Sequence, residues 1–161
     1  MSITPRKQRT KVFRKQVECE WTEKFWKFIE DNLDKSWDWR CLSANPNITF
    51  DIVLAHPDKP WNWYGLSQNP NITFDNVIAH PDKPWIWGWY GLSGNPNITV
   101  DNILSHPNKP WNWENLSANP NITFDIVLAH PNKPWDWELL SRNSNITFDI
   151  VLAHPDKPWN W

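Results

Sequence analysis

The 161-residue chain has few of the residues on which common catalytic and cofactor motifs depend. It holds four glycines, and its sequence has neither a Gly-rich phosphate loop nor a Gly-x-Ser-x-Gly nucleophile motif. Its two cysteines, Cys19 and Cys41, indicate neither a disulfide framework nor a zinc-binding motif. Because no long apolar run is present and no apolar stretch follows the first charged residues, we expect neither a membrane-spanning helix nor a secretory signal. The expected location is a reducing intracellular compartment.

Tryptophan and proline, by contrast, are abundant, with 15 residues of each. Most of them fall in a repeat that reads Leu-Ser-x-Asn-Pro-Asn-Ile-Thr-Phe-Asp, a short apolar run, and then His-Pro-Asp-Lys-Pro-Trp-x-Trp. The period is 24 residues with one step of 26, and the units begin at Trp37, Trp61, Trp85, Trp111 and Trp135, with a partial unit at Trp159. A fixed period of this length indicates a repeat array, in which each unit buries its apolar face against its neighbours.

The apolar run of each unit fits both a strand and a helix at first sight. Residues 48–54 alternate in polarity as a strand does, but their apolar side chains also have the i, i+3, i+4 spacing of a helix. A comparison between units decides the matter, because the position of Ile52 is asparagine in the next two units, whereas the positions of Val53 and Leu54 are apolar in all five. A helix with Val53 and Leu54 on its apolar face explains both facts, so we predict a helix with Thr49 as its N-cap.

A second helix is predicted to begin at Asp58-Lys59-Pro60 and to end near Asn69. Proline is favoured in the first turn of a helix, where its missing N–H is not needed. Two helices of about two turns are too short to be stable alone and depend on packing between units. The predicted fold class is therefore all-α: a right-handed α-solenoid of short helix-turn-helix repeats with a period of 24 residues.

The two ends of the chain depart from the repeat. Residues 22–35, within a predicted N-terminal helix over 16–36, align with the first helix of a unit, with Trp26 at the position of Phe50, but Glu30 stands where the units have leucine or isoleucine. This polar substitution predicts an N-terminal capping helix. The array of five repeats in residues 37–161 ends in the partial unit, so we expect its last face to remain apolar and either to fray or to self-associate.

Charge is unevenly distributed along the chain, although the formal net charge is only −2. Residues 36–161 hold twelve acidic and seven basic residues. Residues 1–15 hold no acidic residue, and their six basic residues are Arg6, Lys7, Arg9, Lys11, Arg14 and Lys15. A basic arm of this kind binds nucleic acid, an acidic partner or an import receptor, or else it is a disordered, solvated tail.

Several chemically capable side chains occur once in every unit, and the repeat itself explains them. Ser43, His56 and Asp58 could be drawn as a hydrolytic triad, but the same set recurs in each unit without a distinct environment to activate one nucleophile. We interpret the histidines as helix-end residues rather than as a metal ladder, and the Asn-Ile-Thr sequences as turns and caps rather than as glycosylation sites. We therefore predict a non-enzymatic protein without a metal or cofactor.

The Trp-x-Trp pairs are interpreted as core packing, although aromatic cages and base-stacking platforms use the same residues. The candidate binding surface consists instead of positions that differ between units, two of which are four residues apart and share one helix face. The unit at Trp85 adds two residues and a third tryptophan, through a duplication slip or as a distinct contact site. Neutral drift is the alternative explanation for the whole set. The candidate partner-binding residues are Arg40, Ala44, Tyr64, Gln68, Ile86, Trp87, Tyr90, Gly94, Glu114, Ala118, Glu138 and Arg142.

The combination of Asn-Pro-Asn-Ile-Thr-Phe-Asp with Lys-Pro-Trp-x-Trp resembles tandem repeats in uncharacterised proteins of giant, amoeba-infecting DNA viruses of the mimivirus group. The resemblance covers residues 37–161 and implies a protein that is made in host cytoplasm or packaged in the virion. It implies no activity, cofactor or catalytic residue.

Three functions follow as hypotheses. The first is a scaffold that binds protein partners. The second is nucleic-acid binding anchored by the basic arm, against which the acidic balance of the repeats argues. The third is a binder of carbohydrate or methylammonium groups that uses tryptophan cages.

Overall fold

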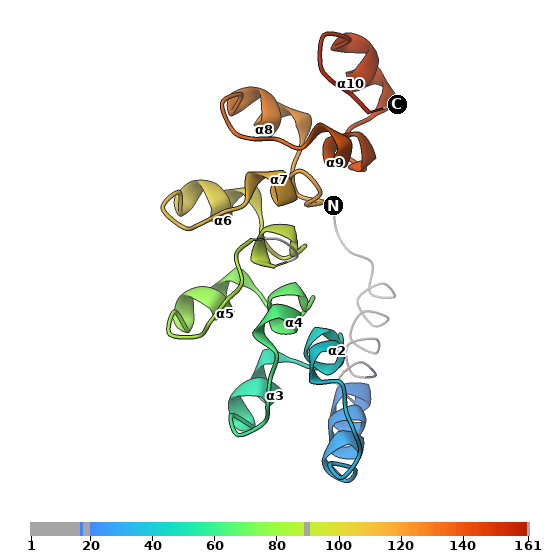
Figure 1. Cartoon of the computed structure of the whole chain (residues 1–161), viewed down its shortest axis with the longest axis vertical. Helices are drawn as coiled ribbons and strands as arrows, with labels where there is room; N and C mark the ends of the chain where they lie inside the picture. The colour runs from blue at the N-terminus through green and yellow to red at the C-terminus, as the bar shows by residue number, and fades with distance from the viewer. Residues whose placement is uncertain (1–16, 18–19, 89–90, 161) are drawn as a thin grey trace, which may run out of the picture.

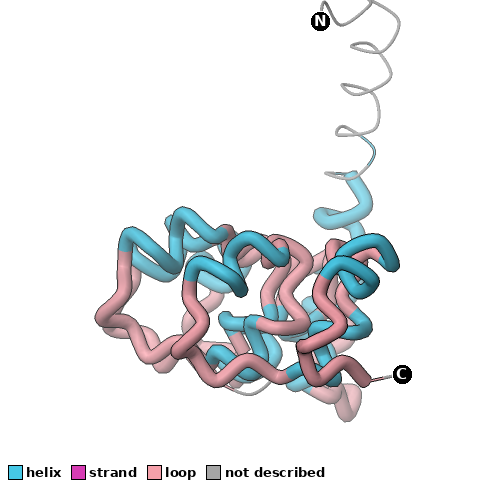
Figure 2. Tube along the Cα trace, turned by 90° about the horizontal axis from the view of Figure 1, so that it is seen from above, coloured by secondary structure: helices cyan, strands magenta, loops and turns pink. Residues whose placement is uncertain are grey.

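The computed structural model describes residue 17 and residues 20–88 and 91–160, and all the regular secondary structure in these parts of the chain is helical. The predicted all-α class is confirmed, and the Cα trace shows only helices and loops over these residues (Figure 2). Within the same ranges, no helix is long and apolar enough to cross a membrane.

Each unit contributes two short helices, which lie in two rows. The helix after Asn-Ile-Thr is called the first helix and the helix after Trp-x-Trp the second, although the second precedes the first in a unit counted from its Trp-x-Trp pair. The first helices are α3 (Phe50–Ala55), α5 (Phe74–Ala79), α6 (Val100–Ser105), α8 (Phe124–Ala129) and α10 (Phe148–Ala153). The second helices are α2 (Trp39–Ala44), α4 (Trp63–Gln68), the 3₁₀ helix η1 (Leu92–Gly94), α7 (Trp113–Leu116) and α9 (Trp137–Arg142). Both rows follow chain order, with α3, α5, α6 and α8 along one side of the molecule and α2, α4, α7 and α9 along the other (Figure 1). A further helix over residues 20–30 lies at the N-terminal end of the rows.

The first helix of each unit begins and ends as predicted. The hydroxyl of Thr49 accepts a hydrogen bond from the backbone N–H of Ile52, and His56 is the C-cap residue just before a proline. The asparagine that replaces Ile52 in the second unit adds a bond, because the side chain of Asn76 accepts from the N–H of Thr73 at 2.9 Å and completes a capping box. The substitution that favoured a helix over a strand therefore strengthens the start of that helix.

The predicted start of the second helix is wrong. Residues 57–62 form a turn and an extended stretch, and α4 begins at Trp63, so Pro60 lies outside the helix. The cap is Asn62, whose side-chain oxygen accepts from the N–H of Gly65 at 2.9 Å. The turn before it is closed by Trp61, whose indole N–H donates to the carbonyl of His56 at 2.8 Å. Proline occupies a position in this turn, where its lack of an N–H is equally harmless.

The placement of Leu54 on the buried face of the first helix is also wrong. Val53 is 4% exposed, but Leu54 is 42% exposed, and its counterparts Ile78, Leu104, Leu128 and Leu152 are exposed as well. Glu30 of the N-terminal helix takes the equivalent exposed position. The charge of Glu30 therefore does not distinguish the end of the array from its middle.

Aromatic rings join successive units into one continuous core. Phe50 packs against His80 of the next unit, with ring centroids 4.9 Å apart, and against Trp85 at the start of the unit after that, at 5.7 Å. Trp26 of the N-terminal helix takes the place of Phe50 and packs in the same way against His56 and Trp61. These rings supply the apolar area that helices of six residues cannot bury alone.

The second tryptophan of each Trp-x-Trp pair meets the first tryptophan of the next unit edge to face. The five pairs have ring centroids 4.9 to 5.3 Å apart and planes crossed at 78 to 90°. The pairs are therefore part of the packing between units, as the sequence indicated. Phe148 in the last first-row helix has no such partners among the described residues and is 67% exposed.

Candidate functional site

From the second unit onward, one buried asparagine in each unit ties that unit to the one before it. Asn69 is fully buried, and its side-chain nitrogen lies 2.8 Å from the carbonyl oxygen of Ser43 and 3.0 Å from those of Asn45 and Ile48. Its side-chain oxygen accepts from the N–H of Asn71 at 2.8 Å. The same backward bonds to the preceding unit are made by Asn95, Asn119 and Asn143. The first asparagines of these segments thus form a ladder of hydrogen bonds that joins successive units.

The serine of each Leu-Ser pair forms a second ladder in the opposite direction. The buried hydroxyl of Ser67 accepts from the N–H of Ile86 in the next unit at 3.0 Å and donates to the carbonyl of Trp63 at 2.8 Å. The forward bond recurs at Ser43, Ser93, Ser117 and Ser141. Each of the four joints between full units therefore combines backward bonds from an asparagine with one forward bond to a serine, and the joint to the partial unit has the serine bond.

The repeated polar residues take structural positions. Asn71, in a sequence that matches a glycosylation site, donates its side-chain N–H to the carbonyl of Ile48 at 3.2 Å. Ser43 accepts a hydrogen bond from the N–H of Asn62, and the ring of His56 accepts one from Trp26. The Ser and His of the conceivable hydrolytic triad are therefore bonded to other residues and not to each other. No three His, Cys, Asp or Glu side chains in the described ranges are placed to hold a metal ion.

The variable positions of the second helices lie on the surface of the second row. Arg40 is exposed, and its guanidinium lies 4.8 Å from the centre of the Tyr64 ring in the next helix. Glu138 pairs with Arg142 one turn later, at 2.6 Å. Glu114, Ala118 and Gly94 are exposed, whereas Ala44 and Gln68 are half-buried. Tyr90 and the basic residues of the N-terminal arm, 1–15, lie outside the described residues.

In the unit with two extra residues, hydrogen bonds connect the described residues on either side of the insertion. The N–H of Leu92 donates to the carbonyl of Ile86 at 2.7 Å, and the hydroxyl of Ser93 donates to the carbonyl of Trp87 at 2.6 Å. Trp87 is half-buried and packs against Trp111 as its counterparts do. Ile86 and Trp87 therefore belong to the frame, and the register of the following unit is preserved.

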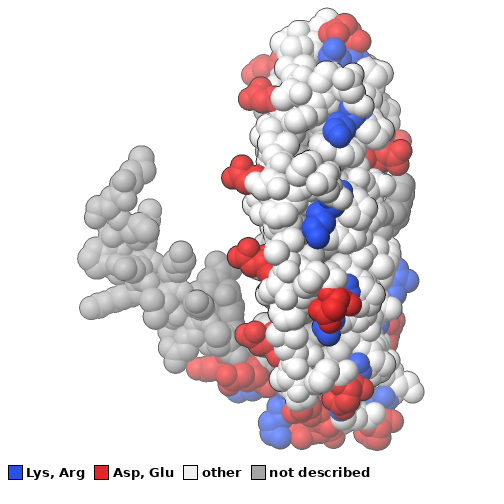
Figure 3. Space-filling view, turned by 90° about the vertical axis from the view of Figure 1, so that its left-hand side faces the viewer, with Lys and Arg blue, Asp and Glu red and all other residues white. Residues whose placement is uncertain are grey.

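Charged residues line the face that carries the first helices, on the other side of the molecule from the second-helix row. Lysine and arginine form a row along the long axis, and acidic residues follow one edge (Figure 3). The lysines of the Lys-Pro pairs take one of two arrangements, depending on the unit. Lys59 pairs with the preceding Asp58 at 2.8 Å, whereas Lys109 and Lys133, each preceded by asparagine, lie over the rings of Trp87 and Trp113. One substitution before the lysine thus decides whether it pairs with a carboxylate or with an indole.

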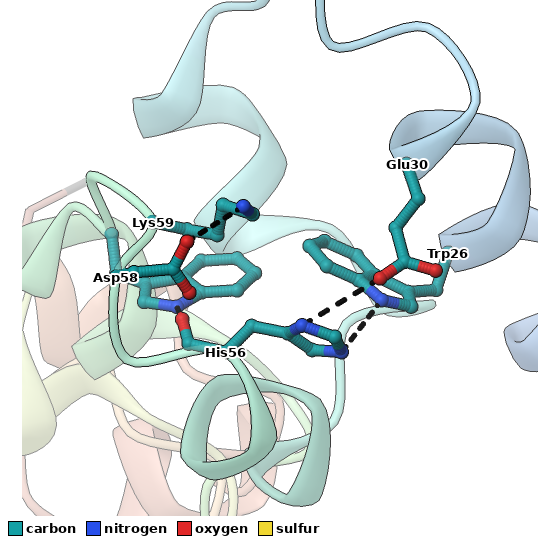
Figure 4. A network of polar contacts seen from close by, with 6 residues as sticks. Trp26, Glu30, His56, Asp58 and Lys59 are labelled. Atoms are coloured by element: carbon teal, nitrogen blue, oxygen red, sulfur yellow. Dashed lines mark hydrogen bonds and ion pairs between the residues drawn. The ribbon is translucent and has the colours of Figure 1, made fainter.

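The junction between the N-terminal helix and the first unit is a polar network (Figure 4). The indole N–H of Trp26 donates to Nε2 of His56 at 2.9 Å. Because an indole nitrogen is only a donor, Nε2 accepts, and the ring proton is on Nδ1. That nitrogen faces a carboxylate oxygen of Glu30 at 3.6 Å. The network fixes the helix of residues 20–30 against the repeats.

Beside this junction lies an open groove of about 960 Å³. It is bounded by the N-terminal helix on one side and by the Asn-Pro-Asn turns of the first two units on the other. Its walls include Trp21, Glu23, Glu30, Asn47, Asp51 and Ile52. Sequence reasoning missed this groove, and the one available signal was that the N-terminal helix has no Asn-Pro-Asn-Ile-Thr turn of its own.

Comparisons of the chain with protein-family models, with curated protein sequences and with solved structures found no match.

Proposed function

We propose that this chain is a non-enzymatic scaffold, a right-handed α-solenoid, that binds a protein partner along its second-helix row. The observation that carries the proposal is that each unit has two sets of residues, a repeated set that holds the fold together and a variable set at the surface. The repeated asparagine, serine and tryptophan side chains are used in bonds between or within units. The positions that differ between units include Arg40, Glu114 and Glu138, which are exposed on helices of the same row. A varied surface on a constant frame is the arrangement by which repeat proteins recognise partners.

The test compares exposed and half-buried residues of the variable row with exposed residues of the first helices. In the variable-row variant, Tyr64, Glu114 and Glu138 are changed to alanine. In the matched control, the repeated and exposed Asp75, Asp101 and Asp125 of the first helices are changed to alanine. Proteins that co-purify with each tagged chain from the cells that make it are compared with those of the unaltered chain.

The variable-row variant should lose partners that the control retains. Equal retention by both variants would mean that the variable residues are neutral. A shift of the recovered material to nucleic acid, released at high salt, would favour the basic arm as the functional element. Origin in a giant virus stays an expectation that follows from the resemblance of the repeats to those of such viruses.

A further inference from the structure

The groove between helix 20–30 and the first two units lies apart from the variable row. We propose that it binds an extended, basic peptide segment of a partner protein. Its volume of about 960 Å³ is at the upper end of the range of ligand pockets. Charge, exposed aromatic area and an unused hydrogen-bond donor all indicate the same occupant.

The charge of the groove is negative. Three carboxylates, those of Glu23, Glu30 and Asp51, lie along its walls and come from both of its sides. Among the described residues of the walls, Lys27 is the one basic side chain, and it pairs with Asp31, just after the same helix, at 3.1 Å. A Lys- or Arg-bearing ligand would meet attractive potential along the groove, whereas a phosphate backbone would be repelled.

An exposed tryptophan adds apolar area beside these carboxylates. Trp21 is 65% exposed, whereas Trp26, which also contributes to the groove, is 6% exposed. An indole face next to carboxylates suits the side chains of lysine and arginine, whose alkyl stems pack on apolar surface and whose charged heads interact with the ring.

The third observation is the hydrogen-bond pattern of the Asn-Pro-Asn turn. In the second unit, the side-chain nitrogen of Asn71 donates to the carbonyl of Ile48 in the preceding turn. Asn47 holds the same place in the first unit and lines the groove, and none of the described residues accepts from its side-chain nitrogen. The preceding element is the helix of residues 20–30, and helix carbonyls before the last turn accept bonds within the helix. An extended peptide would offer the carbonyl that the missing turn does not supply.

The experiment measures binding of a short fluorescein-labelled peptide of alternating lysine and proline, by fluorescence anisotropy at low ionic strength, to the full chain. Proline keeps the probe extended. One variant removes two groove charges, through Glu23→Gln with Asp51→Asn, and another removes the exposed ring, through Trp21→Ala. The matched control removes two equivalent charges outside the groove, through Asp75→Asn with Asp101→Asn. Thermal unfolding of each variant verifies that it is folded.

The groove charge variant should bind at least tenfold more weakly and Trp21→Ala about fivefold more weakly, while the control should stay within twofold of the unaltered chain. A peptide with glutamate in place of lysine should not bind. Absence of lysine-peptide binding, or an equal loss in the control, would overturn the proposal. So would concentration-dependent dimerisation that the groove charge variant abolishes, because the occupant would then be a second copy of this chain. Since no variable-row residue is changed, these results are independent of the proposed scaffold function.

Discussion

At the scale of single residues, asparagine is well suited to the buried position in each joint. The side chain of Asn69 must donate to the carbonyls of the preceding unit and accept from the N–H of Asn71 at the same time. An amide supplies both a donor and an acceptor, whereas the ionised carboxylate of aspartate only accepts. Leucine would fill the space and leave the carbonyls without a donor, which is costly for buried polar groups.

Replacing Asn69 with alanine should therefore destabilise the fold by about 3 kcal/mol, because buried carbonyls of the preceding unit lose their donor. Asn45→Ala is the matched control. Its side chain makes the same local bond to the N–H of Asn47, but no described residue accepts from its side-chain nitrogen. The control should lose about 1 kcal/mol. Equal losses, measured by urea denaturation, would show that the bonds between units contribute little.

The thiol of Cys41 provides a second prediction at this scale. Cys41 donates to a carboxylate oxygen of Asp38 at 3.2 Å, and this bond raises the pKa of the thiol above its ordinary value. At pH 8 the thiolate fraction is therefore reduced, and the exposed thiol should react slowly with a disulfide reagent. Asp38→Asn should lower the thiol pKa and speed the reaction, measured in chains that also carry Cys19→Ser. An unchanged rate would mean that the carboxylate does not control this thiol.

At the scale of elements, the first helix was predictable and the second only in part. Capping threonine and the proline after histidine are local signals, and they located both ends of α3. The signal for the second helix was the middle residue of Trp-x-Trp, which is Asp38 in the first unit and Asn62 in the second, and both cap a helix. In the third unit Ile86 holds this place, and the unit has a 3₁₀ helix instead of an α-helix. Proline drew attention to the wrong residue because it suits turns and first helical turns alike.

The inserted loop depends on one glycine. A Cβ atom on Gly91 would collide with the backbone carbonyl of Ile86, so Gly91→Ala should destabilise the chain by about 3 kcal/mol or more through forced movement of the loop. Gly94, three residues later, has open space at that point, and Gly94→Ala should be neutral or slightly stabilising. Denaturant midpoints of the two variants test this contrast. Equal effects would mean that the loop relaxes without loss.

At the scale of the whole molecule, the period predicted the repeat organisation, but not the groove. The period is a property of identical units, and the groove arises where a non-repeated helix meets two of them. Its residues Trp21 and Asp51 are far apart in sequence, and no local pattern links them. The exposure of Leu54 was missed for a related reason, since an apolar residue in every unit signals burial only if a neighbour covers it, and none does.

The joints predict how the array tolerates deletion. Removing residues 111–134 takes out one period of 24 and should leave a folded chain with a lower denaturant midpoint, because one interface is lost. Removing residues 109–134 instead places Trp135 too close to His106 for the indole-to-carbonyl bond that closes each turn. That chain should unfold at clearly lower denaturant or in two phases. Tryptophan fluorescence during urea titration distinguishes the outcomes, and identical curves would show that the turn is not needed for register.

The crossed indole pairs determine how this protein interacts with polarised ultraviolet light. Two indoles about 5 Å apart share their electronic excitations, and the coupling splits each absorption band into components of opposite circular-dichroism sign. Because the five pairs repeat nearly the same geometry, their contributions add along the chain. The resulting signal overlaps the far-ultraviolet bands of the short helices. The spectrum of this protein therefore reports whether neighbouring units are in contact, in addition to how much of the chain is helical.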